Sequence, residues 1–354
     1  MITKTSISGN GKKRTISDII AGMSYHDALD YLAQKTSVIE LVDQFGGRVA
    51  VSPDWNGRVL TSTCDGLDGD SFGCVNVQAI DADRYEDFGG EDLWTISPFV
   101  HSFGIEDIKE HKTVLQRTLP MNDANGALIE FHLSRSISLL SRQKIGDLFG
   151  DAVAGSLAQE DVSVVGFRSE NTVRSQEKAH VASRQRGMFN ASPHTFVIVS
   201  TPPDDLALEP FPVETDYLGG SPHGRIRHLP QALLIRADGH RQCQTTIPFS
   251  ASPPIFGAVG LRFGTLTLWT FDAPGDSEED MIRIYNSGHP HTDELEWTEY
   301  YEMNCFSAAQ KLQPEDSLTY RQYTLHLNAD NDTLGHLVQQ LFGVPLEKFP
   351  RDIR

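Results

Sequence analysis

Cysteine is scarce in this sequence, with four in 354 residues, at Cys64, Cys74, Cys243 and Cys305. No two of them form a Cys-x-x-Cys pair, which excludes a zinc knuckle, and four thiols are too few to staple a disulfide scaffold. Free thiols in a reducing compartment are therefore expected.

Long apolar runs are also missing. No segment approaches the roughly 18 consecutive apolar residues that a membrane-spanning helix needs. The N-terminal stretch MITKTSISGNGKKRT lacks the apolar run that a signal peptide would require. We expect no membrane partner and a cytoplasmic location, with loss of a secretion leader as the alternative.

Basic residues are too few to balance the acids. The chain has 30 Lys and Arg residues against 48 Asp and Glu residues, which gives a formal net charge of -18. Such a charge opposes binding to phosphate backbones and anionic membrane surfaces. No nucleic acid partner is therefore expected.

Turn-forming residues, by contrast, are abundant, with 18 prolines and 29 glycines. Between the turns lie short segments rich in β-branched and aromatic residues, such as RVAVS, TFVIVS, TLTLWTF and MIRIYN. This pattern predicts an all-β fold, mainly antiparallel, built as one large β-sandwich rather than from βαβ units. We expect this domain to span residues 37–354, after an N-terminal extension of residues 1–36.

Two short accessory helices are predicted, one near each end of the chain. Ser24 precedes an amphipathic segment and is placed to cap it, and leucines repeat at helical spacing from about Asp332 to Phe342. Two connections, 143–161 and 202–230, exceed the usual loop length, which makes them candidates for lids or site walls. The connection 202–230 is equally consistent with a solvent-exposed loop.

One candidate catalytic carboxylate lies in the segment EWTEYYEMNCF, which alternates like a strand. Successive side chains of a strand point to opposite faces. The alternation therefore places Trp297, Glu299, Tyr301, Met303 and Cys305 on one face, and Tyr300, Glu302 and Asn304 on the other. Glu302 is thus expected on a polar face, between a tyrosine and an asparagine.

A second candidate segment is GGEDLW, in which Glu91, Asp92 and Trp94 follow a double glycine. Glycines allow a sharp turn that presents these side chains to a cavity. An indole beside carboxylates suits sugar binding, because the ring covers C–H faces while the acids accept hydroxyl protons. A core tryptophan next to a solvated acidic turn is the alternative.

Three further motifs have a structural alternative as well as a functional one. His194 precedes an apolar strand, where a lone histidine is more often structural than catalytic. Ser71 lies in a G-x-S-x-G match, but its surroundings indicate a turn rather than a nucleophile elbow. His289 and His291, followed by Asp293 and Glu294, offer metal ligands in a turn-like segment, which favours a loop at the rim of a site. We therefore expect no bound metal.

Taken together, these segments resemble the galactose mutarotase-like superfamily, the aldose 1-epimerases and their relatives, and more closely an uncharacterised bacterial branch of it. The resemblance covers about Gly46 to Val344. It rests on YYEMN followed by KLQPEDSLTYRQYTLHL, on VVGFRSENT followed by FNASPHTF, and on GGEDLWTISP. The His-x-Tyr-Phe-Asn pattern of mutarotases does not follow His194.

The resemblance implies a small-molecule carbohydrate as substrate and no cofactor. It puts Glu302 in the place of the general base and His194 in that of the general acid, with a second histidine near His101 in PFVHSFG. The residues expected to bind the substrate are Glu91, Asp92, Trp94, His101, Tyr300 and Asn304.

The activity implied is aldose 1-epimerisation. The alternatives are a glycoside lyase or hydrolase acting on an oligosaccharide, and a sugar-binding protein without catalysis. The acidic composition argues against a uronate or sulfated sugar, unless local basic residues such as Arg225, Arg227 and Arg241 override it.

Overall fold

The computed structural model describes residues 23–93, 101–201, 225–240, 242–248, 255–272, 281–288, 299–307 and 309–350. In this part of the chain every pairing between strands is antiparallel, and the strands form one sheet of eight, one of ten and one of two. The predicted antiparallel β-sandwich with short accessory helices is therefore confirmed.

The eight-stranded sheet carries most of the residues that the sequence singled out. Its order is β1-β2-β3-β4-β10-β18-β17-β14. These strands are Ile39–Val42, Arg48–Ser52, Arg58–Thr63, Gly90–Leu93, Arg184–Asn190, Tyr300–Phe306, Met281–Asn286 and Cys243–Pro248.

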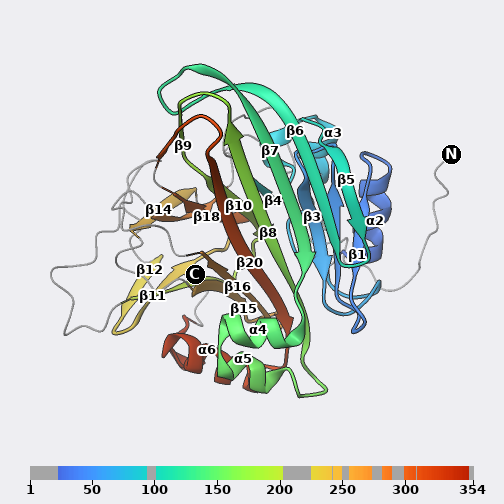
Figure 1. Cartoon of the computed structure of the whole chain (residues 1–354). Coiled ribbons are helices and arrows are strands. Elements are labelled where there is room, and N and C mark those ends of the chain that lie inside the picture. The colour runs from blue at the N-terminus through green and yellow to red at the C-terminus, as the bar shows by residue number, and fades with distance from the viewer. Residues whose placement is uncertain are drawn as a thin grey trace.

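The ten-stranded sheet has the order β12-β13-β11-β15-β16-β20-β8-β7-β6-β5, and its long strands cross the front of Figure 1. These strands are Ile226–Leu229, Ala232–Arg236, Thr195–Ser200, Ile255–Gly260, Thr265–Phe271, Ser317–Asn328, Ser163–Ser175, Leu128–Leu139, Lys112–Asn122 and Gly104–Lys109. The small sheet pairs β9, Ala179–Val181, with β19, Gln310–Leu312.

The main core lies between the two large sheets. On β18, the side chains of Tyr301, Met303 and Cys305 pack with those of Trp269 and Phe256 from the ten-stranded sheet. These residues are buried, and their apolar surface is the main favourable contribution to holding the layers together. The residues that alternate with them on β18 consequently point out of the sandwich.

Both predicted helices are confirmed. Helix α2, Tyr25–Ala33, starts at Ser24, whose side chain accepts a hydrogen bond from the backbone N–H of Asp27. Helix α6, Asn331–Phe342, buries Leu334, Leu337, Val338 and Phe342 at helical spacing. No helix in the described ranges is long and apolar enough to cross a membrane.

The connection 143–161, expected as a lid or site wall, consists largely of two helices instead. These are α4, Arg142–Phe149, and α5, Asp151–Ser156. Ile145, Phe149 and Val153 recur every four residues and are buried against the outside of the ten-stranded sheet, beside α6. Figure 1 shows α4, α5 and α6 grouped together. The glycines in this segment concealed its helical spacing.

The outer face of the eight-stranded sheet is covered only in part by the described helices. Helix α2 and the short helix α3, Val77–Asp81, pack over β2 and β3 through Ala50 and Leu60. The same face continues over β4, β10, β18 and β17, where its side chains are mostly polar or charged.

Candidate functional site

Strand register brings polar residues from four strands into rows on this outer face. One row runs from Asp92 on β4 through Arg186 on β10 and Asn304 on β18 to Arg283 on β17. The next row places Glu302 between Met188 and Tyr285. Directly paired residues of antiparallel strands point to the same face. We call the following set the charged face: Arg58, Asp92, Arg184, Arg186, Arg283, Tyr285, Tyr300, Glu302 and Asn304.

Asp92 lies at the buried end of the charged face, between two arginines. Arg58 Nη2 donates to Asp92 Oδ2 at 2.5 Å, and Arg186 Nη2 donates to the same oxygen at 2.9 Å. Burial would raise the pKa of this carboxyl, but the charges of Arg186 and Arg58 outweigh burial and hold the pKa well below its usual range. Asp92 is therefore ionised at neutral pH and is a poor proton donor.

Glu302 lies at the centre of the charged face. Its carboxylate oxygens are 3.5 Å from Arg184 Nη2 and 3.6 Å from Arg186 Nη1. Asn304 Nδ2 donates to Glu302 Oε2 at 3.2 Å. The side chain is 8% exposed, against 23% for Arg184, so the carboxylate lies just beneath a more accessible guanidinium. It is held in place by donors, as a positioned base requires.

Aromatic rings border Glu302 on the same face. Tyr285 on β17 is paired directly with Glu302 on β18. The Tyr285 hydroxyl accepts a hydrogen bond from Gln242 Nε2 at 2.9 Å. The Tyr300 hydroxyl donates to Asp87 Oδ1 at 3.1 Å, and burial is the main cause that raises the pKa of this phenol. Phe306 is half-buried one step further along β18. These rings offer apolar surface beside hydrogen-bonding groups, as sugar recognition requires.

Glu91 lies apart from the charged face, contrary to the expected substrate-binding role beside Asp92. Adjacent residues of a strand point to opposite faces. Glu91 therefore points between the sheets, where Thr324 Oγ1 donates to its Oε2 at 3.0 Å. Burial raises the pKa of Glu91 to about 8. His326, whose Nε2 lies 3.9 Å from Glu91 Oε1, has its pKa lowered to about 3 by burial, so both groups are neutral at pH 7.

His194 lies in the turn between β10 and β11. Its backbone N–H donates to Ser192 Oγ at 3.4 Å, and its carbonyl accepts from the backbone N–H of Leu261, in the turn after β15. Glu302 pairs with Met188, six positions earlier along the chain. The register therefore leads away from Glu302 towards the turn that holds His194.

His101 lies against the β2–β3 turn. Its backbone N–H donates to Asn56 Oδ1 at 2.6 Å, and Asn56 donates back from its own N–H. Burial and the charge of Arg117 lower the pKa of His101. Asn56 is two residues before Arg58, so His101 borders the strand that supplies one arginine of the charged face.

Arg186 is one of several residues of this face that the sequence motifs did not reveal, together with Arg58, Arg184, Arg283 and Tyr285. The mutarotase spacing His-x-Tyr-Phe-Asn, not found after His194, is approached earlier in the chain by Arg186-Gly187-Met188-Phe189-Asn190. Arginine occupies the position of the histidine in this match. The phenylalanine and asparagine at the last two positions were the signal that could have located it.

Trp94, His289 and His291 lie outside the described residues. Among the residues that are described, no group of three or more histidine, cysteine, aspartate or glutamate side chains is arranged to hold a metal ion.

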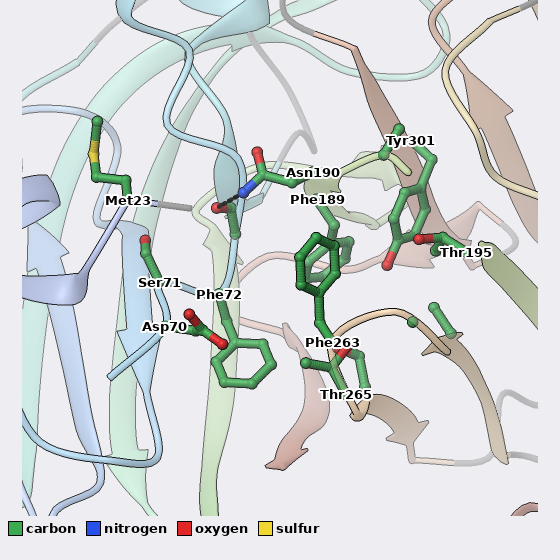
Figure 2. Close-up of a pocket in the computed structure, with 15 residues that line it drawn as sticks. Met23, Asp70, Ser71, Phe72, Phe189, Asn190, Thr195, Phe263, Thr265 and Tyr301 are labelled. Carbon is green, nitrogen blue, oxygen red and sulfur yellow. Dashed lines mark hydrogen bonds between the residues drawn. The ribbon is translucent and has the colours of Figure 1, made fainter. Parts of the chain in front are cut away.

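A cavity of about 90 Å³ lies at one end of the sandwich, on the opposite side of β18 from Glu302. Figure 2 shows Asp70, Ser71 and Phe72 on one side of it, and Phe189 and Tyr301 on the other. Ser71 Oγ shares a hydrogen bond of 2.6 Å with Oγ1 of Thr61 on β3, and Ser71 itself lies in irregular chain between two isolated β-bridges. Ligand pockets usually measure about 300–1,000 Å³, so this cavity is small for a sugar.

A larger hollow of about 450 Å³ lies where the β1–β2 turn meets the start of α4. Its lining is mainly apolar and includes Phe45, Leu139 and Ile145. Its polar groups are already engaged: Asp43 Oδ1 accepts from the backbone N–H groups of Phe45 and Gly47, and His111 Nδ1 contacts the carbonyl of Val42 at 2.7 Å. This hollow offers less hydrogen-bonding capacity than the charged face.

The architecture is that of the galactose mutarotase-like β-sandwiches. A galactose mutarotase-like protein from Lactobacillus casei superposes with a TM-score of 0.51 at 7% identity, over 82% of this chain and 100% of its own. The Slr1438 protein from Synechocystis sp. PCC 6803 gives a TM-score of 0.51 at 11% identity, over 83% and 96%. A putative aldose 1-epimerase from Escherichia coli K12 gives 0.50 at 10% identity, over 83% and 99%.

At these identities the likeness defines the fold alone. The sequence itself matches a family model over residues 23–105 and 99–352, and the chain belongs to that family, which is described as a family of unknown function, DUF6786. No curated protein matches the chain.

Proposed function

We propose that the charged face binds a monosaccharide and that Glu302 acts there as the general base of an aldose 1-epimerase-like reaction. The observation that carries this proposal is the placement of Glu302. It lies on the outward face of a central strand, fixed by Asn304 and two arginines, with the rings of Tyr285 and Tyr300 beside it. A sugar needs this combination of acceptor, donors and ring surface.

The proposed reaction opens and recloses the sugar ring, with one proton removed from the C1 hydroxyl and one delivered to the ring oxygen. Glu302 takes the proton of the C1 hydroxyl, the electron pair forms the C1=O bond, and the bond between C1 and the ring oxygen breaks. The ring oxygen takes the electron pair and a proton from water. After rotation about the C1–C2 bond, the reverse steps close the ring on the other face of C1, and Glu302 returns its proton.

Arg186 would serve this reaction differently from a histidine. A guanidinium keeps its proton in proteins, so Arg186 is not a practical general acid. It can instead stabilise negative charge on the ring oxygen as the ring opens. Its side chain lies within 3.6 Å of Glu302, which supports an electrostatic role next to the base.

The same observation favours sugar binding without catalysis as the second candidate. The charged face, as defined here from the described residues, contains no histidine, the side chain best able to exchange protons near pH 7. A hydrolase acting on an oligosaccharide is less well supported, because inverting and retaining enzymes need a protonated carboxylic acid as well as a base. The nearby carboxyl, Asp92, has a pKa well below its usual range and stays ionised.

Anomer exchange measured by NMR tests the proposal. Aldoses such as glucose and galactose are equilibrated with the purified chain, and exchange between α and β anomers is compared with the uncatalysed rate. The chain is expected to accelerate exchange for at least one sugar. Glu302→Gln should lower kcat by roughly 10²-fold or more, the scale of a lost general base.

Glu299→Gln is the matched control, because this carboxylate lies three residues away, just before β18, and contacts His240 Nδ1 at 3.2 Å instead. It should keep the normal exchange rate. Equal rates in Glu302→Gln and the unaltered chain, with both shown to be folded, would remove Glu302 as the base. Binding without any exchange would establish the second candidate instead.

A further inference from the structure

The charged face collects arginines in a chain that is acidic as a whole. Among the described residues of this face, four arginines accompany two carboxylates, Asp92 and Glu302, and a third carboxylate, Asp87, accepts a hydrogen bond from Tyr300 at its border. The chain carries a formal net charge of -18. A local excess of positive charge against that background favours an anionic ligand.

Two of these arginines lie at the more accessible edge of the charged face. Arg184 Nη2 donates to Asn304 Oδ1 at 2.9 Å, and Asn304 Nδ2 donates to the carbonyl oxygen of Arg283 at 3.2 Å. Both guanidinium carbons lie over the ring of Phe306, at 5.0 Å for Arg184 and 4.5 Å for Arg283. The two side chains therefore flank one amide and one ring.

The Phe306 ring limits how far both guanidinium groups can turn, and the Asn304 amide oxygen also holds that of Arg184. Glu302 is two residues from Asn304 on the same strand and accepts a hydrogen bond from it. A ligand beside the base thus has Arg283 of β17 opposite Asn304, two residues along β18 from Glu302, and Arg184 of β10 opposite Phe306, four residues along. This separation suits a sugar with a substituent that projects from its ring.

Arginine at positions 184 and 283 indicates which chemical groups the ligand carries. Its planar fork forms paired hydrogen bonds to carboxylate and phosphate oxygens, and it is more weakly hydrated than lysine. Recognition of a neutral sugar, which offers only hydroxyl groups, does not require two guanidinium groups. The local excess of positive charge favours an anionic sugar, although the overall composition argues against one. Arg225 and Arg227, named from the sequence, contact Asp238 and the carbonyl of Lys348 instead.

We infer that the ligand of the charged face is an anionic monosaccharide, whose carboxylate or phosphate group is bound by Arg184 and Arg283 while its ring lies beside Glu302. This inference rests on the proposed function. The inference adds the chemical class of the sugar to that proposed function.

Calorimetric titration with four probes tests this inference: glucose, glucuronate, glucose 6-phosphate and inorganic phosphate. At least one anionic sugar should bind about tenfold or more tightly than glucose, and its affinity should fall as salt is added. Tighter binding of glucuronate identifies a carboxylate as the anion, and tighter binding of glucose 6-phosphate identifies a phosphate. Arg184→Gln and Arg283→Gln should each lose about tenfold in affinity for that sugar, a larger loss than either variant shows for glucose.

Arg262→Gln is the matched control, because Arg262 also lies over a phenylalanine ring, at 5.4 Å from Phe263, but in the turn between β15 and β16. It should bind all four probes normally. If glucose binds as well as the anionic sugars, the inference is wrong and the proposed function stands. If inorganic phosphate binds as tightly as the sugar phosphate, the face is a simple anion site and the inference is overturned. If no probe binds and no anomers exchange, the proposed function fails as well.

Discussion

Tyr301 and Glu302 are consecutive residues of β18 whose side chains lie on opposite faces of the eight-stranded sheet. Tyr301 lines the small cavity between the sheets, whereas Glu302 lies among the arginines of the charged face. A single strand therefore separates two places where a ligand could be sought. The chemistry favours the side of Glu302, because the cavity holds few charged groups and little volume.

Asp92 is expected to hold the buried part of the charged face together. Asp92→Asn would leave Arg58 and Arg186, both buried, without their shared carboxylate. Removing one partner of a buried ion pair costs about 3–5 kcal/mol, because the remaining charge stays out of water. Urea denaturation should show a loss of that order in the free energy of unfolding. A loss below about 1 kcal/mol would mean that water already solvates these arginines.

Glu91 should make stability depend on pH. Its pKa is about 8 in the folded chain, above its usual value of 4.5, so the folded state holds a proton that the unfolded state releases. The stabilisation is complete below pH 4.5 and is lost as pH rises through about 8. Glu91→Gln should flatten the decline in the free energy of unfolding between pH 6.5 and 9.

The control for this measurement is Glu130→Gln, since Glu130 is exposed. It should retain the slope of the unaltered chain. Below pH 6.5 His326 acts in the opposite direction, because its pKa is about 3 when folded and it must stay neutral. An unchanged slope in Glu91→Gln above pH 6.5 would show that Glu91 is ionised in the folded chain.

His194 should contribute little to anomer exchange. It lies beyond the point where β10 pairs with β18, and its backbone contacts Ser192 and Leu261. His194→Asn is therefore expected to keep kcat within about threefold of the unaltered chain, far less than the effect expected of a lost general acid. A reduction of 10²-fold, measured by the same NMR exchange experiment on folded protein, would restore His194 as the acid.

The sandwich was predictable because its inner strands follow simple rules. Segments such as TFVIVS and TLTLWTF are short, β-branched and bounded by turns, and both form central strands of the ten-stranded sheet. Strand β10, RQRGMFN, was missed because two arginines and a glycine interrupt its apolar pattern. Those arginines are the ones that face Glu302, so the feature that concealed the strand is part of the site.

The site was predictable only along single strands. Alternation placed Tyr300, Glu302 and Asn304 on one polar face, and the pairing of β18 agrees with it. Alternation also separates Glu91 from Asp92, which the composition of their segment did not reveal. The convergence of Arg58, Arg186 and Arg283 depends on which strands are neighbours, and strand order in a sheet of distant segments cannot be read from local pattern.

A crystal structure with a bound monosaccharide tests the central claim most directly. The account predicts that the sugar lies on the outer face of the eight-stranded sheet, with a ring hydroxyl within hydrogen-bond distance of Glu302 and the side chains of Arg184 and Arg283 at its substituent. A sugar seated instead in the cavity beside Tyr301 and Phe189, with the carboxylate of Glu302 untouched, would contradict it.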